Sequence, residues 1–138
     1  MKASELRLGN LVLCNTSIGF VDAIASVCNL SSDEIVCYHK PTKQFIFCKD
    51  ALFEPIPLTE EWLINFGMEY TDGFSSSRRL YFNNHEYDLS QVTYNEKEGL
   101  LRFSNGHPKG TSLIPHIKYV HQLQNLHFAL SGKELIIK

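Results

Sequence analysis

The residues best suited to chemistry in this chain are cationic and hydroxyl side chains in its second half. The segment 99–133 contains no aspartate or glutamate, yet it holds four lysine or arginine residues and four histidines. Part of it is a loop with histidine, lysine, glycine and hydroxyl groups before an expected helix, where backbone N–H groups and the helix dipole favour anions. The candidate residues for binding an anionic ligand are Arg78, Arg79, Tyr81, His107, Lys109 and Thr111.

Two interpretations of these residues are open at the level of sequence. In the first, the cations hold phosphate groups while Tyr81, Tyr87 or Trp62 offers an aromatic face to a base. In the second, scattered cations only keep one surface hydrated, and Trp62 is a core residue, as large aromatic side chains usually are.

An enzymatic mechanism is disfavoured because the sequence lacks the motifs that assemble one. It contains no His-Glu-x-x-His, Gly-x-Ser-x-Gly, P-loop or Gly-x-Gly-x-x-Gly pattern. The run Asn84-His85-Glu86 is similar to part of a metal-dependent nuclease motif, but no second histidine-rich element lies at a fitting spacing. A small hydrolase that uses His85 or His107 is the remaining enzymatic alternative, and no catalytic residue is predicted.

Neither the six histidines nor the four cysteines have the spacing of a metal site, and no metal or cofactor is predicted. His116 and His121 are five positions apart, whereas residues that share a helical face are three or four apart. The cysteines form no Cys-x-x-Cys pair. Each cysteine lies within an apolar run, so we expect the cysteines to be buried as small hydrophobic residues. They are Cys14, Cys28, Cys37 and Cys48.

The overall composition is that of a folded protein without a strong net charge. The chain has 138 residues, 43% of them hydrophobic, and a formal net charge of −2. This length allows one compact domain or two very small ones, and the net charge excludes a general attraction to nucleic acid or anionic membranes. The first ten residues contain no apolar signal-peptide core, and no apolar stretch is long enough to span a bilayer. We therefore expect a soluble cytoplasmic protein with no membrane partner.

The first half of the chain is expected to form a small β-barrel. Residues 5–54 contain short runs rich in valine, isoleucine and aromatic residues, separated by polar or proline-containing turns. In the last of these runs, Phe45 and Phe47 share one strand face while Ile46 and Cys48 share the other. Because both faces are apolar, a curled or closed sheet is favoured, and four or five strands in this length match an SH3-like barrel.

The second half is expected to be a short helix followed by a β-β-β-α-β unit, which makes the chain an α+β protein. The short helix should cover 60–66, with Thr59 as N-cap and Gly67 as its stop. Pro115 and Gly132 fit the two ends of an amphipathic helix. The expected segments are strands at 78–82, 86–94 and 100–104, the helix at 115–130 and a closing strand at 134–138. The halves, 1–57 and 58–138, are expected to pack as one compact unit.

Three stretches of the sequence carry a resemblance. They are LRLGNLV at 6–12, PIPLTEEWLINFG at 55–67 and IKYVHQLQNLHFALSGKEL at 117–135. In these motifs the chain closely resembles a family of small uncharacterised proteins encoded by phages, prophages and mobile elements of gut Bacteroidetes. The resemblance implies an accessory protein of the bacterial host cytoplasm. It implies no activity and no site residues, and its motifs are a capped helix and an amphipathic helix.

These observations together favour a non-enzymatic phage or mobile-element protein that counters host defence by sequestering an anionic nucleotide signal. Segment 99–133 contributes a charge of +4, which leaves −6 for the remainder of the chain, so a local anion site is compatible with the net charge. Such a protein is expected to be a homo-oligomer, because a small domain gains an enclosed pocket by sharing walls between subunits. The alternatives are a protein–protein or nucleic-acid interaction module, with a host protein as one possible partner, and a small hydrolase.

Overall fold

A computed structural model describes most of the chain, which divides into two compact units. Unit 1 comprises Met1–Pro57 and Tyr119–Leu126, and unit 2 comprises Leu58–Lys118 and His127–Lys138. The sequence also predicted a division after residue 57, but it assigned the whole of 58–138 to the second half. The described residues are 3–16, 19, 22–31, 34–47, 51–71, 79–82, 92–95, 100–104, 111–113 and 117–138.

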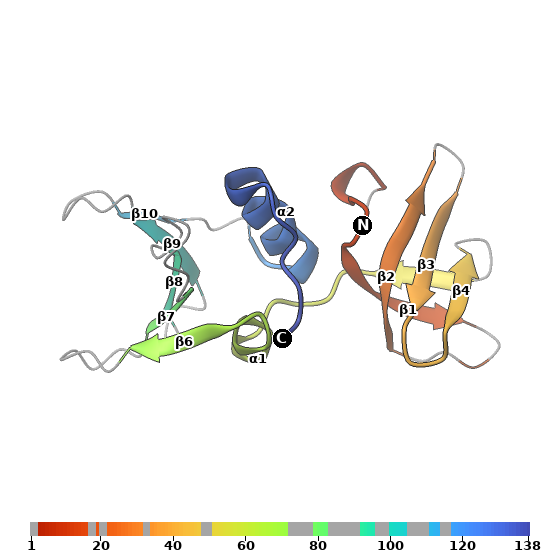
Figure 1. Ribbon diagram of the computed structural model, residues 1–138, viewed down its shortest axis with the longest axis horizontal. Helices are drawn as coiled ribbons and strands as arrows, with labels where there is room; N and C mark the ends of the chain where they lie inside the picture. Colours follow the sequence, from red (N-terminus) through yellow and green to blue (C-terminus); the bar gives the residue numbers. More distant parts are fainter. Residues whose placement is uncertain are drawn as a thin grey trace. The chain divides into compact units, whose positions relative to one another are not determined.

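Unit 1 contains one antiparallel sheet of five strands, with the order β4-β3-β2-β1-β5. A short 3-10 helix, η1 (Ala3–Glu5), precedes it. The strands are β1 (Leu11–Thr16), β2 (Ala23–Leu30), β3 (Ile35–His39), β4 (Gln44–Phe47) and β5 (Ala51–Glu54). Figure 1 draws them in red to yellow and shows that they cross one another steeply, as strands of a strongly twisted sheet do. The predicted strand-rich first half is confirmed. Barrel closure stays a prediction, since no ladder among the described residues joins β4 to β5.

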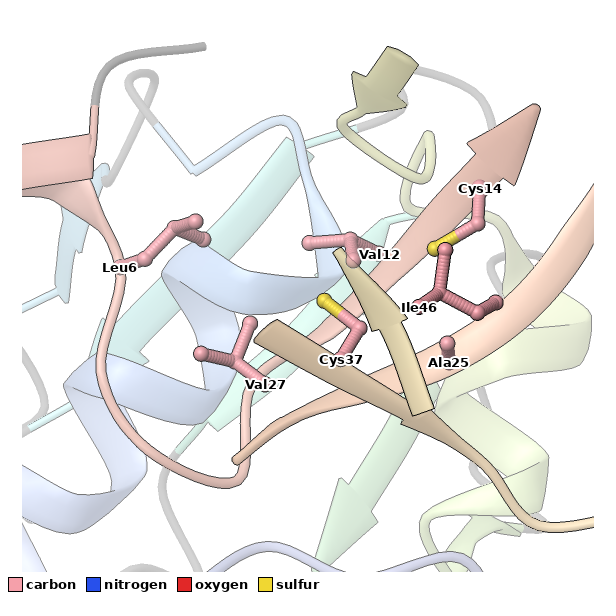
Figure 2. Close-up of a cluster of buried hydrophobic side chains, with 7 residues drawn as sticks. All are labelled: Leu6, Val12, Cys14, Ala25, Val27, Cys37 and Ile46. Atoms are coloured by element: carbon pink, nitrogen blue, oxygen red, sulfur yellow. The ribbon is translucent and has the colours of Figure 1, made fainter. Parts of the chain in front are cut away.

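The core of unit 1 lies on one face of this sheet. Figure 2 shows seven buried side chains converging there, with Leu6 reaching in from the segment before β1. The strands supply the others in alternation, because every second residue of a strand faces the same side. Cys14 and Cys37 belong to this cluster and are fully buried, which confirms their prediction as small hydrophobic residues. The other members are Val12, Ala25, Val27 and Ile46.

A β-bulge in β2 changes which side of the strand faces the core. The register with β3 shifts between Val27 and Asn29, so Cys28 is the additional residue. Val27 faces the core before the bulge and Leu30 packs against it afterwards, although an unbroken strand would turn Asn29 inward. Cys28 itself is exposed and its thiol donates to the carbonyl oxygen of Val36 at 3.3 Å. The prediction that Cys28 is buried was therefore wrong, while Cys48 lies outside the described residues.

Helix α2 (Val120–Ser131) begins five residues later than the sequence predicted, so Pro115 is not its first residue. The reason is a pairing with a distant segment. The Val120 N–H donates to the Ile56 carbonyl at 3.0 Å, and the Leu58 N–H donates to the Lys118 carbonyl at 2.9 Å. The two bonds form an isolated antiparallel β-bridge between Pro57 and Tyr119, so the backbone just before α2 is not helical.

The first turns of α2 bring two buried polar side chains into unit 1. Gln124 accepts from the Leu11 N–H at 2.9 Å and donates to the Gly9 carbonyl at 3.3 Å, so its amide satisfies two backbone groups at the start of β1. His121 is only 1% exposed and stacks on Tyr119 with ring centroids 5.8 Å apart. Among the described residues neither ring nitrogen of His121 has a hydrogen-bond partner. Burial lowers the pKa of His121 below its ordinary value, and the Glu5 carboxylate opposes this change.

Unit 2 contains the short helix α1 (Glu60–Asn65) and a second antiparallel sheet of five strands. Thr59 caps the helix by accepting from the Trp62 N–H at 3.5 Å, and Gly67 follows it with φ +86°, so the predicted helix and both of its end signals are confirmed. The strand order is β10-β9-β8-β7-β6. The strands are β6 (Met68–Thr71), β7 (Arg79–Phe82), β8 (Val92–Asn95), β9 (Leu100–Ser104) and β10 (Thr111–Leu113).

Two features of the predicted β-β-β-α-β unit were wrong. The strands β6 and β10 were not predicted, and they form the two edges of the sheet. The segment 134–138 is not a strand. Its Leu135 is buried, and the Lys138 N–H donates to the Asn65 carbonyl at the end of α1 at 3.0 Å, so the segment packs on a helix end. The described part of the chain contains no helix of the length and apolarity that a bilayer crossing requires.

Two glycines with a left-handed backbone end the helices. Gly67 has φ +86° and Gly132 has φ +70°. A Cβ built at Gly67 would meet only the flexible end of the Lys138 side chain, and nothing in the described residues lies within 4 Å of one built at Gly132. We therefore expect Gly67→Ala and Gly132→Ala each to lower the free energy of unfolding by about 1–2 kcal/mol through backbone strain. Urea denaturation measures both, and an unchanged stability in either variant would contradict the left-handed backbone at that position.

Candidate ligand-binding surface

The structure describes only three of the six residues predicted to bind an anion. Arg79 and Tyr81 lie on β7, and Thr111 begins β10. Arg79 and Tyr81 are two positions apart on this strand. Arg78, His107 and Lys109 lie outside the described residues, as do His85 and Tyr87.

The sheet register separates Thr111 from the residues on β7. Two strands, β8 and β9, lie between β10 and β7, and three strand spacings amount to about 14 Å. Thr111 pairs with Ser104, the last residue of β9. Arg79 pairs with Asn95, and Asn95 pairs with Leu100, the first residue of β9. Thr111 and Arg79 therefore also lie toward opposite ends of β9. The described backbone therefore places Arg79 and Tyr81 on one strand and Thr111 on a distant strand of the same sheet. A single site of all six residues stays a prediction.

A serine lies beside a histidine at the end of α2, and such a pair is one that nucleophilic catalysis would need. Ser131 Oγ lies 3.3 Å from His127 Nδ1. The same nitrogen lies 3.0 Å from the carbonyl oxygen of Lys133, which can only accept, so Nδ1 carries the proton and cannot act as a base toward Ser131. The Ser131 hydroxyl donates to the His127 carbonyl at 2.7 Å. This arrangement secures a helix end. The described residues also contain no group of three side chains placed to hold a metal.

The strongest candidate for a ligand surface is in unit 1, on the face of the β3–β4 hairpin opposite the core. We call it the aromatic–lysine surface and define it as Tyr38, Lys40, Lys43, Phe45 and Phe47. Its aromatic residues are partly or largely accessible, since Phe45 is 62% exposed and Phe47 is 40% exposed. Aromatic side chains at such positions, next to cations, combine a stacking face with charge that attracts phosphate.

The hairpin register places the aromatic rings side by side. Tyr38 on β3 is directly opposite Phe45 on β4, and their ring centroids are 5.2 Å apart with the planes tilted by 51°. Phe47 follows Phe45 by two positions on the same face and is opposite Val36. Ile46, between them, faces the core and is buried. The strand β4 is an edge of the sheet, so no further strand among the described residues borders these rings.

The two lysines lie in the tight turn that joins β3 to β4. Both side chains are exposed. The Lys43 N–H donates to the Lys40 carbonyl at 3.3 Å, and His39 Nδ1 lies 2.7 Å from Thr42 Oγ1, so the turn is internally bonded. The one carboxylate within 34–47, that of Glu34, is at the opposite end of the hairpin. The charge beside Tyr38 and Phe45 along the hairpin is therefore positive.

Lys43 occupies a conformation that is costly for a lysine. Its φ is +56°, in the left-handed region where glycine and asparagine are favoured. Backbone strain of this kind is common where a side chain is needed for function. We expect Lys43→Gly to raise the free energy of unfolding by about 0.5–1 kcal/mol, measured by urea denaturation. Lys40→Gly is the control and should not stabilise. A loss of stability in Lys43→Gly would contradict the strain at this position.

The alternation of residues 44–48 predicted that Phe45 and Phe47 share one strand face, and this apolar face favoured a closed barrel. The signal for exposure lies in the same run, because lysines at 40 and 43 and glutamine at 44 precede Phe45. Trp62, for which the sequence left a stacking role and a core role open, is half-buried and packs beside Phe66 with ring centroids 5.7 Å apart.

The comparisons with known proteins add no relative to this picture. No protein-family model matches the chain, and no curated protein or solved structure is significantly similar to it. The assignment of fold and site therefore rests on the residues described above.

Proposed function

We propose that this chain is a non-enzymatic binding protein that takes up an anionic nucleotide ligand on the aromatic–lysine surface. The observation that carries the proposal is the exposed Phe45 ring, paired with Tyr38 at 5.2 Å and followed along the hairpin by two exposed lysines. A nucleotide supplies the two matching groups, a planar base and a phosphate. Stacking on one ring and neutralising one charge are both favourable without any catalytic group.

Binding without turnover is favoured by the chemistry around the surface. The hairpin 34–47 contains one histidine, His39, whose Nδ1 is engaged with Thr42. The exposed thiol of Cys28 donates to a backbone carbonyl, and the pair of Ser131 and His127 secures the end of α2. A hydrolase needs a nucleophile, a base and an orienting group in contact, and the described residues supply no such set.

The biological role that we propose follows from the motif resemblance. A phage or mobile-element protein in the host cytoplasm that binds a nucleotide signal could blunt a defence response by sequestering it. The strand order β4-β3-β2-β1-β5, with β5 paired to β1, supports an SH3-like barrel for unit 1. Homo-oligomerisation would serve this role, because the aromatic–lysine surface is open and a second subunit could supply the missing wall.

The test is a titration of the full chain with a panel of mononucleotides, cyclic nucleotides and ADP-ribose-type nucleotides, followed by melting temperature and by calorimetry. We expect at least one nucleotide to stabilise the protein, and Phe45→Ser to weaken that binding by about ten-fold or more. Leu52→Ser is the matched control, because Leu52 is 71% exposed on the opposite edge strand β5, away from the lysines.

Three results would contradict the proposal. The first is that no nucleotide stabilises the protein at millimolar concentration. The second is that Lys109→Ala abolishes binding while Phe45→Ser has no effect, which would place the site in the cationic segment 99–133. The third is that the nucleotide is recovered hydrolysed after prolonged incubation, which would make the protein an enzyme.

A further inference from the structure

We infer that the aromatic–lysine surface binds single-stranded nucleic acid across at least two successive bases. This inference rests on the proposed function and names its ligand class. It is carried by the arrangement of Phe45 and Phe47, which form two ring positions in line on one edge strand.

The spacing of the two rings suits consecutive bases. Phe45 and Phe47 are two positions apart on β4, and a strand advances about 6.8 Å over two residues. An extended nucleic acid strand with unstacked bases separates successive bases by a comparable distance. Phe45, supported from β3 by Tyr38, would receive one base and Phe47 the next. Stacking of this kind accepts any base, because every base has a π-face.

The openness of the surface favours a polymer over a mononucleotide. Small molecules bind tightly in concave sites that bury most of their surface. Here the rings lie on the outer face of an edge strand, so a mononucleotide is covered on one side and binds less tightly than a strand that engages both rings. A strand that engages two rings and the turn at once adds these contributions, and each stacked base strengthens binding by roughly ten-fold.

The charge on the hairpin determines how strongly the binding affinity should depend on salt concentration. Lys40 and Lys43 are both exposed at the turn, while Glu34 is at the other end of the hairpin. Two phosphate contacts from these lysines predict a slope of about −1.4 for log K against log salt concentration, since each contact contributes about −0.7 on a single strand. The surface is thus a short, weakly cationic stacking platform, which agrees with the absence of an overall basic charge in the chain.

The experiment measures the affinity of the full chain for oligothymidylates of one, two, four and eight nucleotides, by calorimetry at several salt concentrations. We expect affinity to rise by roughly ten-fold from one to two nucleotides, and the salt slope to fall towards zero in the double variant Lys40→Gln, Lys43→Gln. Phe47→Ser should remove the gain in affinity from the second nucleotide, so that this variant binds one and two nucleotides with similar affinity. Leu52→Ser is the control, and melting temperatures confirm that every variant is folded.

The other outcomes separate this inference from the proposed function. Saturable binding of a mononucleotide with no gain in longer oligomers would overturn the inference and leave the proposed function standing. Failure of both mononucleotides and oligomers to bind would overturn the two together. Equal affinity for a poly-glutamate peptide of the same charge would also overturn the inference, because the surface would then recognise charge without stacking.

Discussion

Replacing Gln124 with leucine is expected to lower the free energy of unfolding of this protein by about 3 kcal/mol. The Gln124 amide accepts from the Leu11 N–H at 2.9 Å and donates to the Gly9 carbonyl at 3.3 Å. Leucine has similar volume and good helix propensity, so the change removes the hydrogen bonds without opening a cavity. It leaves two backbone groups of a partly buried segment unpaired, and each such group costs about 1–3 kcal/mol.

Urea denaturation of the full chain measures this loss. Asn125→Leu is the companion variant on the next position of α2, where Asn125 Nδ2 donates to the Glu5 carbonyl at 2.9 Å in an exposed setting. Water can replace that bond, so a loss of less than about 1 kcal/mol is expected. If Gln124→Leu lowered the free energy of unfolding as little as Asn125→Leu, the conclusion that Gln124 attaches α2 to the start of β1 would be wrong.

The opposite effect is expected at His121, one turn earlier in the same helix. Its ring is almost fully buried, and neither nitrogen has a hydrogen-bond partner among the described residues. His121→Leu removes two buried polar atoms and gives up the stacking on Tyr119. We expect a net gain of about 1–2 kcal/mol in the free energy of unfolding at pH 7, because an unpaired buried polar group costs more than a stacked ring pair contributes.

The same residue should make stability depend on pH. Burial lowers the pKa of His121 in the folded protein below the value of about 6.5 of an unfolded chain. As the pH falls below 6.5, the unfolded state therefore takes up the proton more readily, and stability is lost. The stability that depends on a neutral His121 is fully present above pH 6.5. It declines as the pH falls below 6.5, and the decline ends once the pH is below the pKa of His121 in the folded protein.

Denaturation curves at pH 7.5 and pH 5 compare the wild type with His121→Leu. The wild type should lose more stability between these pH values than the variant, whose other titrating groups are the same. A pH slope that survives in His121→Leu, or a loss of stability in that variant at pH 7, would contradict this account of the buried ring.

Local signals predicted the parts of the fold that local interactions determine. Thr59 and Gly67 bound α1 because a cap and a left-handed stop act within one turn of the helix. The start of α2 depends instead on Ile56, which is 64 positions away from Val120 and pairs with it. No pattern around Pro115 contains that information. The bulge at Cys28 is equally hidden, since the run around it reads as an ordinary apolar strand.

The buried polar residues of α2 show the same limit for the core. The amphipathic helix predicted from the sequence had an apolar stripe of Tyr119, Leu123, Leu126 and Leu130, with Val120 and His127 beside it. The structure buries His121 and Gln124 along with Val120 and Leu123. Gln124 is inside because the Gly9 carbonyl and the Leu11 N–H need partners, and these backbone groups lie more than a hundred residues away in the sequence. The residues next to a polar side chain in the sequence do not show whether it has such a distant hydrogen-bond partner.

The candidate surface was only half predictable for a related reason. Alternation correctly placed Phe45 and Phe47 on one face and Ile46 on the other. Which face the core occupies depends on the pairing of all five strands, and the core formed on the side of Ile46. The cationic segment predicted from the sequence contributes Thr111 to a sheet edge, and two strands separate Thr111 from the strand of Arg79.

A map of backbone amide chemical shifts during titration of the isotope-labelled full chain with oligothymidylate would locate the ligand surface. We expect the largest changes on the β3–β4 hairpin, from Tyr38 to Phe47, and we expect them to vanish in Phe45→Ser but persist in Leu52→Ser. Changes confined to the cationic segment 99–133, or no changes at saturating oligonucleotide, would show that the hairpin is not the ligand surface.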